Sequence, residues 1–377
     1  MFDLKAIALS RSPAEWALIA LLGLLAAVSV SRGLTDALSH SQDMQWSPLV
    51  VFWRRHLEPY QAYIAAPHPP LFILSQAPNN LHLTFFVLAP LAWLDFGSAK
   101  LAWAIANIGF LAGAALLFRK ASGVPRAGLV ALGLAASTSA RISIENGQLS
   151  LFCLFFCAAY LVAAPRNTAL AAALSSLGAI KYSFGAPLFF QGRLTPTYVL
   201  AFAALPVAAL LYWSLRFHLD PLHALLLPAR VSALSVGGED GVGDVMMFVR
   251  RLGASPMLAY GLAGALLLAV AGLQRAFLPT DDRLALSAFY ATLSLWLVYH
   301  RIYDFVFLAP AALVAVRSRC APVRVGLLLG AAYFWFGFEA LLDVGVLLDP
   351  LIDNLILLAM LGLIGWEMRA SATTARN

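Results

Sequence analysis

Charged side chains are scarce in this sequence. Asp, Glu, Lys and Arg make up only 12% of its 377 residues, whereas soluble globular proteins contain about 25%. Hydrophobic residues account for 61% of the chain, and the mean hydropathy is +0.81. A soluble fold cannot bury that much apolar surface. The composition therefore predicts an all-α integral membrane protein, because helices satisfy their own backbone hydrogen bonds in lipid, and we expect residues 1–377 to form one domain.

Cysteine is also scarce, with only three in the chain. Cys153 and Cys157 lie four residues apart in an apolar run, so they would share one helix face, and their spacing predicts neither a zinc site nor a disulfide framework. The sequence has no Walker A pattern, no dinucleotide-binding glycine fingerprint and no His-Glu-x-x-His motif. We predict no cofactor and no metal.

Positive charge exceeds negative charge, with a formal net charge of +6. Such a balance can indicate nucleic-acid binding, but the 25 Lys and Arg residues are scattered between apolar segments and form no basic tract. Membrane topology explains this pattern better, because Lys and Arg collect in cytoplasmic loops. We therefore expect membrane lipids, and no nucleic acid, as partners.

Apolar segments predict about twelve membrane helices, the first of which is a retained signal anchor with its N-terminal side in the cytoplasm. Two long outer loops follow from this topology, over residues 31–98 and 216–253. Within the first loop, 46–56 and 81–94 are predicted to be interfacial or re-entrant helices. The predicted spans are 14–30, 99–118, 127–140, 149–164, 168–180, 184–191, 196–215, 254–273, 284–299, 305–316, 325–341 and 351–366.

This topology places the histidines and most carboxylates on the outer face, where they could form a catalytic site. A transporter would place ionisable residues near the membrane midplane and would show internal repeats, and no convincing repeat is visible. The pattern favours an enzyme over a multipass transporter of lipid-linked or small solutes. A third alternative is a non-catalytic scaffold of an envelope-assembly complex.

Asp43 is the candidate catalytic residue of the first outer loop. It follows the first span closely enough to lie at the level of lipid headgroups, where its carboxylate could accept a proton from a sugar hydroxyl. The alternative is a solvated loop charge, since most loop carboxylates have no chemical role. Further along, Tyr60 and His68 are candidates for an acceptor site or a polar cavity.

Several short features follow one another along the chain: Asp43, Pro59 with Tyr60, Pro90, the run Asn146-Gly147-Gln148, Lys181, and His300 with Asp304. Their order resembles glycosyltransferase family 87 of the GT-C superfamily, the type that uses polyprenol-phosphate-mannose. The resemblance covers residues 10–310. The chain departs from the family pattern in a looser aromatic-Pro-Pro run before Pro90 and at Tyr182, where proline is common.

The resemblance implies a GT-C-like bundle in a bacterial inner membrane, with the active site facing the periplasm. It implies that Asp43 deprotonates an acceptor hydroxyl, which attacks the anomeric carbon of a polyprenyl-phospho-sugar with inversion. Mannose is the sugar that the family implies, and the acceptor would be a lipid-linked sugar or a glycan. Positive charge near the leaving phosphate would assist the reaction.

Lys181 is a candidate for that positive charge, because a lysine between apolar segments is costly in lipid unless it meets an anion. The alternative is that its side chain snorkels to the interface. His300, Arg301 and Asp304 end a predicted span and could contact donor phosphate or sugar. Alternatively, Arg301 and Asp304 form only an ion pair at a helix end.

Two further groups complete the predicted site. Glu145, Asn146 and Gln148 could bind sugar hydroxyls, or they could cap the helix that begins near residue 149. Arg250 and Arg251 follow a glycine-rich acidic stretch, which by default is a mobile loop. If that loop closes over the substrate, the two arginines would face the phosphate.

Overall fold

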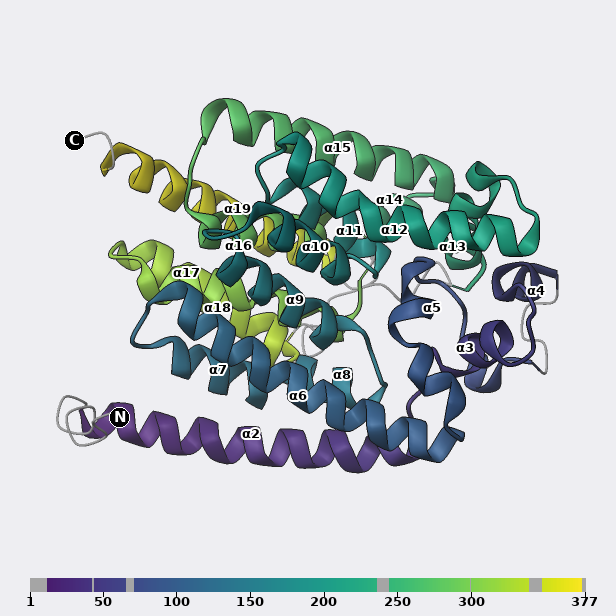
Figure 1. The fold of residues 1–377 in the computed structure, drawn as a ribbon. Helices are drawn as coiled ribbons and strands as arrows, with labels where there is room; N and C mark the ends of the chain where they lie inside the picture. Colours follow the sequence, from purple (N-terminus) through teal and green to yellow (C-terminus); the bar gives the residue numbers. More distant parts are fainter. Residues whose placement is uncertain are drawn as a thin grey trace.

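The computed structural model describes residues 12–42, 44–65, 71–235, 244–298, 300–338 and 348–374. Every regular element in these ranges is a helix, as Figure 1 shows, so the all-α fold class is confirmed for the described residues. The elements are α2 Pro13–Ser39, α3 Trp46–Trp53, α4 Pro59–Ala65, η1 Ile73–Ser75, α5 Leu83–Val87, η2 Ala89–Trp93, α6 Phe96–Ser122, α7 Ala127–Ala136, α8 Thr138–Glu145, α9 Ser150–Ala163, α10 Thr168–Gly178, α11 Tyr182–Phe190, α12 Pro196–Phe217, α13 Pro221–Ser235, α14 Val245–Arg251, α15 Pro256–Phe277, α16 Arg283–Leu297, η3 Ile302–Leu308, α17 Ala309–Arg317, α18 Ala321–Trp335 and α19 Leu348–Thr374.

Five of the described helices are long and apolar enough to cross a membrane, namely α2, α6, α12, α15 and α19. The number is six if the bent pair α7 and α8 forms one span. These helices identify a membrane protein. The predicted number of about twelve spans is not confirmed, because α9, α10, α16 and α18 are apolar but have at most 17 residues, and a helix needs about 20 to cross a bilayer.

The span predicted over 127–140 is wrong as a single helix. The structure has two helices there, α7 and α8, whose axes differ by 55°. Ser137 lies between them in an extended conformation, and its side-chain oxygen accepts a hydrogen bond from the Ala140 amide at 3.0 Å. The same hydroxyl donates to the carbonyl of Leu134. A serine that closes one helix and caps the next produces the bend.

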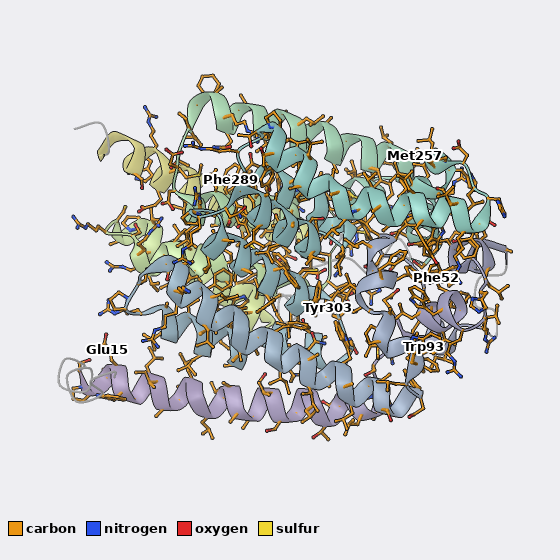
Figure 2. The ribbon with its side chains drawn as sticks, in the orientation of Figure 1. Glu15, Phe52, Trp93, Met257, Phe289 and Tyr303 are labelled. Carbon is orange, nitrogen blue, oxygen red and sulfur yellow. The ribbon has the colours of Figure 1, made fainter. Side chains whose placement is uncertain are left out.

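The helices form a bundle with two distinct ends (Figure 1). The start of α2 and the end of α19 are both at one end of the bundle, on opposite sides of it, and we call this end the terminal end. The short helices α3, α4 and α5 gather at the opposite end, which we call the loop end. Figure 2 shows the same separation, with Glu15 at the terminal end and with Phe52 and Trp93 at the loop end. Between the two ends, α2 packs along α7 and α8, and α16 packs against α11, α17 and α19.

The two long predicted loops are largely helical where the structure describes them. The first span continues to Ser39, beyond its predicted end, and the rest of the first loop contains α3, α4, η1, α5 and η2. The second loop contains α13 and α14. The residues between these two helices, 236–243, lie outside the described residues.

An aromatic cluster joins the first loop to α12. Phe52 of α3 stacks on Trp213 of α12, with ring centroids 4.5 Å apart and planes inclined by 10°. The Trp213 indole N–H donates to Glu58 Oε1 at 2.9 Å, and burial raises the pKa of Glu58 to about 7. The Arg216 side chain, also from α12, contacts the same ring. Its guanidinium carbon lies 4.4 Å from the Phe52 ring centroid. These contacts fix the loop end on the long helices.

Basic residues outnumber acidic residues among the described residues of the terminal end. The acidic residues there are Glu15, Asp281, Asp282 and Glu367. An excess of positive charge is typical of a cytoplasmic membrane face. The orientation of the bundle in a membrane stays a prediction. The basic residues are Arg119, Lys120, Arg126, Arg166, Arg193, Arg275, Arg283, Arg317, Arg319, Arg324 and Arg369.

Candidate functional site

A polar cavity of about 110 Å³ lies where the first loop meets the bundle. Four residues predicted from sequence line it together, although they come from distant segments: Gln148, Lys181, Arg301 and Asp304. Its described lining residues are Gln45, Gln76, Ala77, Asn79, Asn80, Gln148, Leu149, Lys181, Tyr182, Ser235, Arg301, Tyr303 and Asp304.

Lys181 and Asp304 form the central ion pair of the cavity. Lys181 precedes the first turn of α11, and its ammonium lies 2.5 Å from Asp304 Oδ1 and 2.7 Å from Oδ2. The two side chains are 12% and 1% exposed. Lys181 therefore does not snorkel into solvent, because a buried carboxylate neutralises it. The alternative Arg301–Asp304 ion pair is also replaced, since the Asp304 carboxylate pairs with Lys181.

Neighbouring groups hold this ion pair in place. The Ser150 hydroxyl, at the start of α9, donates to Asp304 Oδ1. The Arg301 backbone N–H lies 3.4 Å from Asp304 Oδ2. The Lys181 ammonium lies 4.7 Å from the ring centroid of Tyr303, a distance that permits a cation–π contact. Figure 2 places Tyr303 in the interior of the molecule, between the long helices and the loop end.

Carboxamide side chains provide most of the remaining polar lining. Gln45, Asn79, Asn80 and Gln148 each present both a donor and an acceptor. Sugar hydroxyls also donate and accept, so this lining is chemically suited to a carbohydrate. The charged side chains among the described lining residues are Lys181, Arg301 and Asp304.

Gln76 fixes the segment that precedes α3. Its Oε1 accepts hydrogen bonds from the Ser47 backbone N–H and hydroxyl, both at 2.9 Å. Its Nε2 donates to the Ser41 carbonyl at 3.4 Å. One buried amide thus joins residues 41 and 47, on either side of Asp43. Asp43 itself lies outside the described residues.

The turn between α8 and α9 packs against the same segment. Gly147 has a φ of +69°, and a Cβ at this position would lie 2.9 Å from the Met44 Cβ. The Gly147 carbonyl accepts a hydrogen bond from the Trp103 indole at 2.8 Å, and the Glu145 carbonyl accepts one from the Ser41 amide at 3.2 Å. This turn therefore holds the residues that flank Asp43 close to the cavity wall that contains Gln45.

His300 does not line the cavity. It is 1% exposed and lies with Nδ1 3.9 Å from Oδ2 of Asp244, which is fully buried. Asp244 caps α14 by accepting a hydrogen bond from the Met247 amide at 2.8 Å. Burial lowers the pKa of His300 to about 4 and raises that of Asp244 to about 7. Burial thus disfavours the charged form of both groups. His300 is not among the described residues that line the cavity, and its contact with the donor stays a prediction.

Tyr60 is also buried behind the cavity wall. Its hydroxyl donates to the Asn80 carbonyl at 2.6 Å, and burial raises its pKa. Tyr60 therefore positions Asn80, which lines the cavity, and does not reach the cavity itself. His68 lies outside the described residues.

The other predicted residues lie away from the cavity lining. Glu145 forms an ion pair with Arg141 at 3.0 Å, and Asn146 ends α8. Neither caps α9 with a side chain, because Leu149 occupies its N-cap position without such a bond. Arg250 and Arg251 lie in the last turn of α14. Whether they close over a substrate stays a prediction.

Sequence reasoning missed much of the polar lining. Gln76, Asn79 and Asn80 lie in one short stretch of the first loop, and Ser150 begins α9. Three amides around a proline, in a chain this poor in polar residues, were a signal that could have been used. Ser150 and Tyr303 carried no such signal, because only the folded chain brings Ser150 to Asp304 and Tyr303 to Lys181.

Comparison with protein families, with curated proteins and with solved structures gives no match. The fold and the site together define a helical membrane protein with a polar cavity, which is lined by a buried ion pair and several carboxamide side chains. The resemblance to glycosyltransferase family 87 stays a prediction.

Proposed function

We propose that this protein is an inverting membrane glycosyltransferase of the GT-C type. It moves a sugar, mannose by family resemblance, from a polyprenyl-phosphate donor to a lipid-linked or glycan acceptor. One observation carries the proposal. The cavity gathers Gln148, Lys181, Arg301 and Asp304 with Gln45, which lies two residues after Asp43 in the sequence, and Asp43 is the residue that the resemblance implies as the base.

In the proposed reaction Asp43 accepts the proton of the acceptor hydroxyl. The hydroxyl oxygen bonds to the anomeric carbon from the face opposite the phosphate, and the bond between that carbon and the phosphate oxygen breaks. The bonding electrons remain on the leaving phosphate, so the configuration inverts and one base is sufficient.

Positive charge in the cavity favours this step because the phosphate gains charge. A phosphodiester with one negative charge becomes a monoester with two, so groups near its oxygens bind the transition state more strongly than the ground state. The proposed cationic groups are Arg301 and Lys181, whose ammonium shares its charge between Asp304 and the phosphate oxygens. Asp304 keeps Lys181 oriented within the cavity, and Ser150 in turn holds Asp304.

The carboxamides are proposed to bind the sugar. Gln45, Asn79, Asn80 and Gln148 provide neutral donors and acceptors around the ion pair. A neutral lining binds hydroxyls without attracting a second charged group. The sugar would therefore be an uncharged hexose or pentose.

The proposed setting is a bacterial inner membrane with the loop end in the periplasm. The excess of basic residues at the terminal end supports this orientation. About twelve passes would require the shorter apolar helices, such as α9 and α16, to cross the membrane together with the five long ones.

Sugar transfer by the purified protein tests this proposal. Labelled polyprenyl-phospho-sugars are offered with a membrane extract as the acceptor source, and transfer is compared among wild type, Lys181→Met and Lys100→Met. Lys100 lies near the start of α6 and does not line the cavity. We expect transfer by wild type and by Lys100→Met, and a loss of at least about tenfold in Lys181→Met. Equal transfer by Lys181→Met would remove the cavity from the reaction.

A transporter is the second candidate, and the bend between α7 and α8 favours it. Broken helices of this kind surround the binding sites of many transporters. Flux of a lipid-linked or small solute into proteoliposomes distinguishes the two. Undiminished flux in Asp43→Asn, without sugar transfer in wild type, would support transport and contradict the enzyme.

A further inference from the structure

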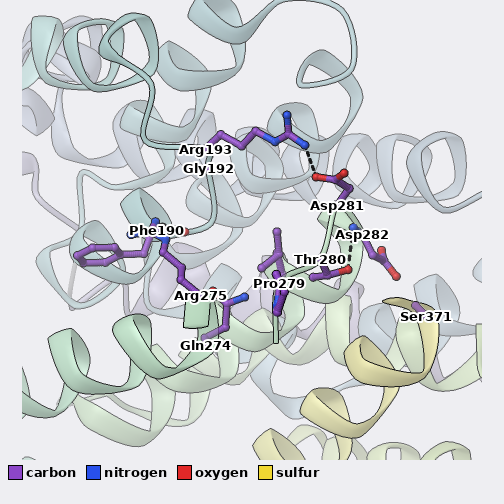
Figure 3. A pocket seen from close by; sticks show the side chains of 11 residues that line it. Phe190, Gly192, Arg193, Gln274, Arg275, Pro279, Thr280, Asp281, Asp282 and Ser371 are labelled. Carbon is purple, nitrogen blue, oxygen red and sulfur yellow. Dashed lines mark hydrogen bonds and ion pairs between the residues drawn. The ribbon is translucent and has the colours of Figure 1, made fainter. Parts of the chain in front are cut away.

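A second cavity lies at the terminal end, far from the polar cavity, and the proposed sugar transfer makes no use of it. Its volume is about 520 Å³. The loop after α11, the last turn of α15, the following segment and the end of α19 form its walls (Figure 3). The described lining residues are Phe190, Gly192, Arg193, Gln274, Arg275, Pro279, Thr280, Asp281, Asp282, Leu286 and Ser371.

The carboxylates of this cavity already have cationic partners. Asp281 pairs with Arg193, and Asp282 pairs with Arg317, whose Nη1 lies 3.1 Å from its Oδ1. Figure 3 shows the Arg193–Asp281 pair at one edge of the cavity and Arg275 at another. Within the described chain, no carboxylate lies within ion-pair distance of Arg275. The cavity therefore carries one positive charge that the described chain leaves uncompensated.

Arg275 is held in a way that keeps donors available. Its guanidinium lies 5.3 Å from the Phe190 ring centroid, and its Nη2 lies 3.4 Å from the Phe190 carbonyl. A guanidinium has five N–H donors, so these contacts leave several for a ligand. Beside it, the buried Gln274 amide is fixed by the Leu278 carbonyl and the Tyr290 hydroxyl, both at 2.9 Å. The binding surface is thus ordered before any ligand arrives.

A shallow apolar path continues from Arg275 along α15. Gly272 and Leu268 lie three and seven residues before Arg275, so they share its helix face, and Gly264 and Gly261 extend that face. Apart from the neighbouring residues and backbone of α15 itself, no described atom lies within 4 Å of a Cβ placed on any of these three glycines. Leu268 is 63% exposed. Because α15 is one of the membrane-length helices, this path faces lipid tails.

We propose that this cavity binds an anionic phospholipid. The phosphodiester of the headgroup contacts Arg275, and one acyl chain lies along the glycine-containing face of α15. A single uncompensated cation matches a lipid with one negative charge, such as phosphatidylglycerol. Basic pockets between membrane helices on the cytoplasmic side are known sites for anionic headgroups. Free phosphate could bind Arg275 in the same way as the lipid headgroup. The apolar path favours a lipid, because only a lipid has an acyl chain that can lie along it.

Native mass spectrometry of the full-length protein tests the proposal. The purified protein is released from micelles that contain equal amounts of phosphatidylglycerol and phosphatidylcholine, and bound lipid is counted for wild type, Arg275→Gln and Lys120→Gln. Lys120 is an exposed cation of the terminal end that does not line the cavity, so it reports general attraction. We expect wild type to retain phosphatidylglycerol selectively, Arg275→Gln to bind about fivefold less, and Lys120→Gln to match wild type.

A second variant separates lipid from free phosphate. Gly272→Leu fills the apolar path without changing the charge, so it should weaken binding of phosphatidylglycerol and leave binding of inorganic phosphate unchanged. Three results would overturn the proposal: equal retention of both lipids by wild type, equal losses in Arg275→Gln and Lys120→Gln, or displacement of the lipid by inorganic phosphate at matched concentration.

Discussion

The buried pair His300 and Asp244 should affect how stability depends on pH. Substituting one or the other should change that dependence in opposite directions. Both side chains are almost inaccessible to solvent, and burial shifts each pKa in the direction that favours the neutral form of the group. The pKa of His300 falls from 6.5 to about 4, and that of Asp244 rises from 3.8 to about 7. Each shift makes stability depend on pH, and the two dependences oppose one another.

The direction follows from proton binding in the two states. Between pH of about 4 and 6.5 the unfolded chain protonates His300 and the folded chain does not, so His300 makes stability rise with pH. Between pH of about 4 and 7 the folded chain keeps Asp244 protonated and the unfolded chain does not, so Asp244 makes stability fall with pH. In the wild type these slopes largely cancel up to pH of about 6.5.

Single substitutions should expose each slope. In Asp244→Asn, His300 is the only member of the pair that titrates. The unfolding free energy of this variant should rise with pH by up to about 1.4 kcal/mol per pH unit, or about 3 kcal/mol between pH of about 4 and 6.5. His300→Gln leaves Asp244 alone, and its unfolding free energy should fall with pH by a similar amount. Other titrating groups, Glu58 among them, contribute equally to all three proteins and drop out of the differences.

Denaturant titration of the purified proteins in neutral detergent, at several pH values between about 4.5 and 7.5, measures these slopes. Only the differences from wild type at each pH are used. Slopes of the same sign in the two variants, or curves parallel to wild type, would refute the assignment of the buried neutral pair.

Two further substitutions test the architecture around the polar cavity. Lys181→Met should lower the free energy of unfolding by about 3 kcal/mol, because it leaves Asp304 buried and unpaired. Adding Asp304→Asn should restore most of that stability in denaturant titration without restoring sugar transfer. No recovery of stability in the double variant would contradict the ion pair. Gly147→Ala should lower the free energy of unfolding by about 1 to 2 kcal/mol, since its Cβ would meet Met44 and its φ is positive. Gly128→Ala in α7 is the control and should leave stability unchanged or raise it. Equal changes in stability in the two variants would contradict the packed turn.

Much of the helical framework could be predicted from sequence, because apolar runs and basic clusters mark where membrane helices begin and end. The run predicted over 99–118 lies within α6, and the run predicted over 254–273 overlaps α15 from Pro256 onward. The break at Ser137 could not be predicted, since a serine is equally compatible with the interior of an apolar helix. Its capping role appears only in the bent geometry.

The candidate site was predictable in part for a different reason. Ionisable residues are so rare in this chain that Lys181 and Asp304 stood out, and both line the cavity. Their pairing was not predictable, because 123 residues separate them and local spacing favoured Arg301 as the partner of Asp304. His300 stood out equally, yet packing buries it against Asp244.

The central claim is that Asp43 is the base of a sugar transfer that takes place at the polar cavity. The most direct test is the transfer rate of Asp43→Asn, with Asp36→Asn as the matched control. Asp36 is an acid of the same region that pairs with Arg32 on α2. We predict that Asp43→Asn loses at least about a hundredfold in rate while remaining folded, and that Asp36→Asn keeps its activity. Equal rates in wild type and Asp43→Asn would contradict the claim.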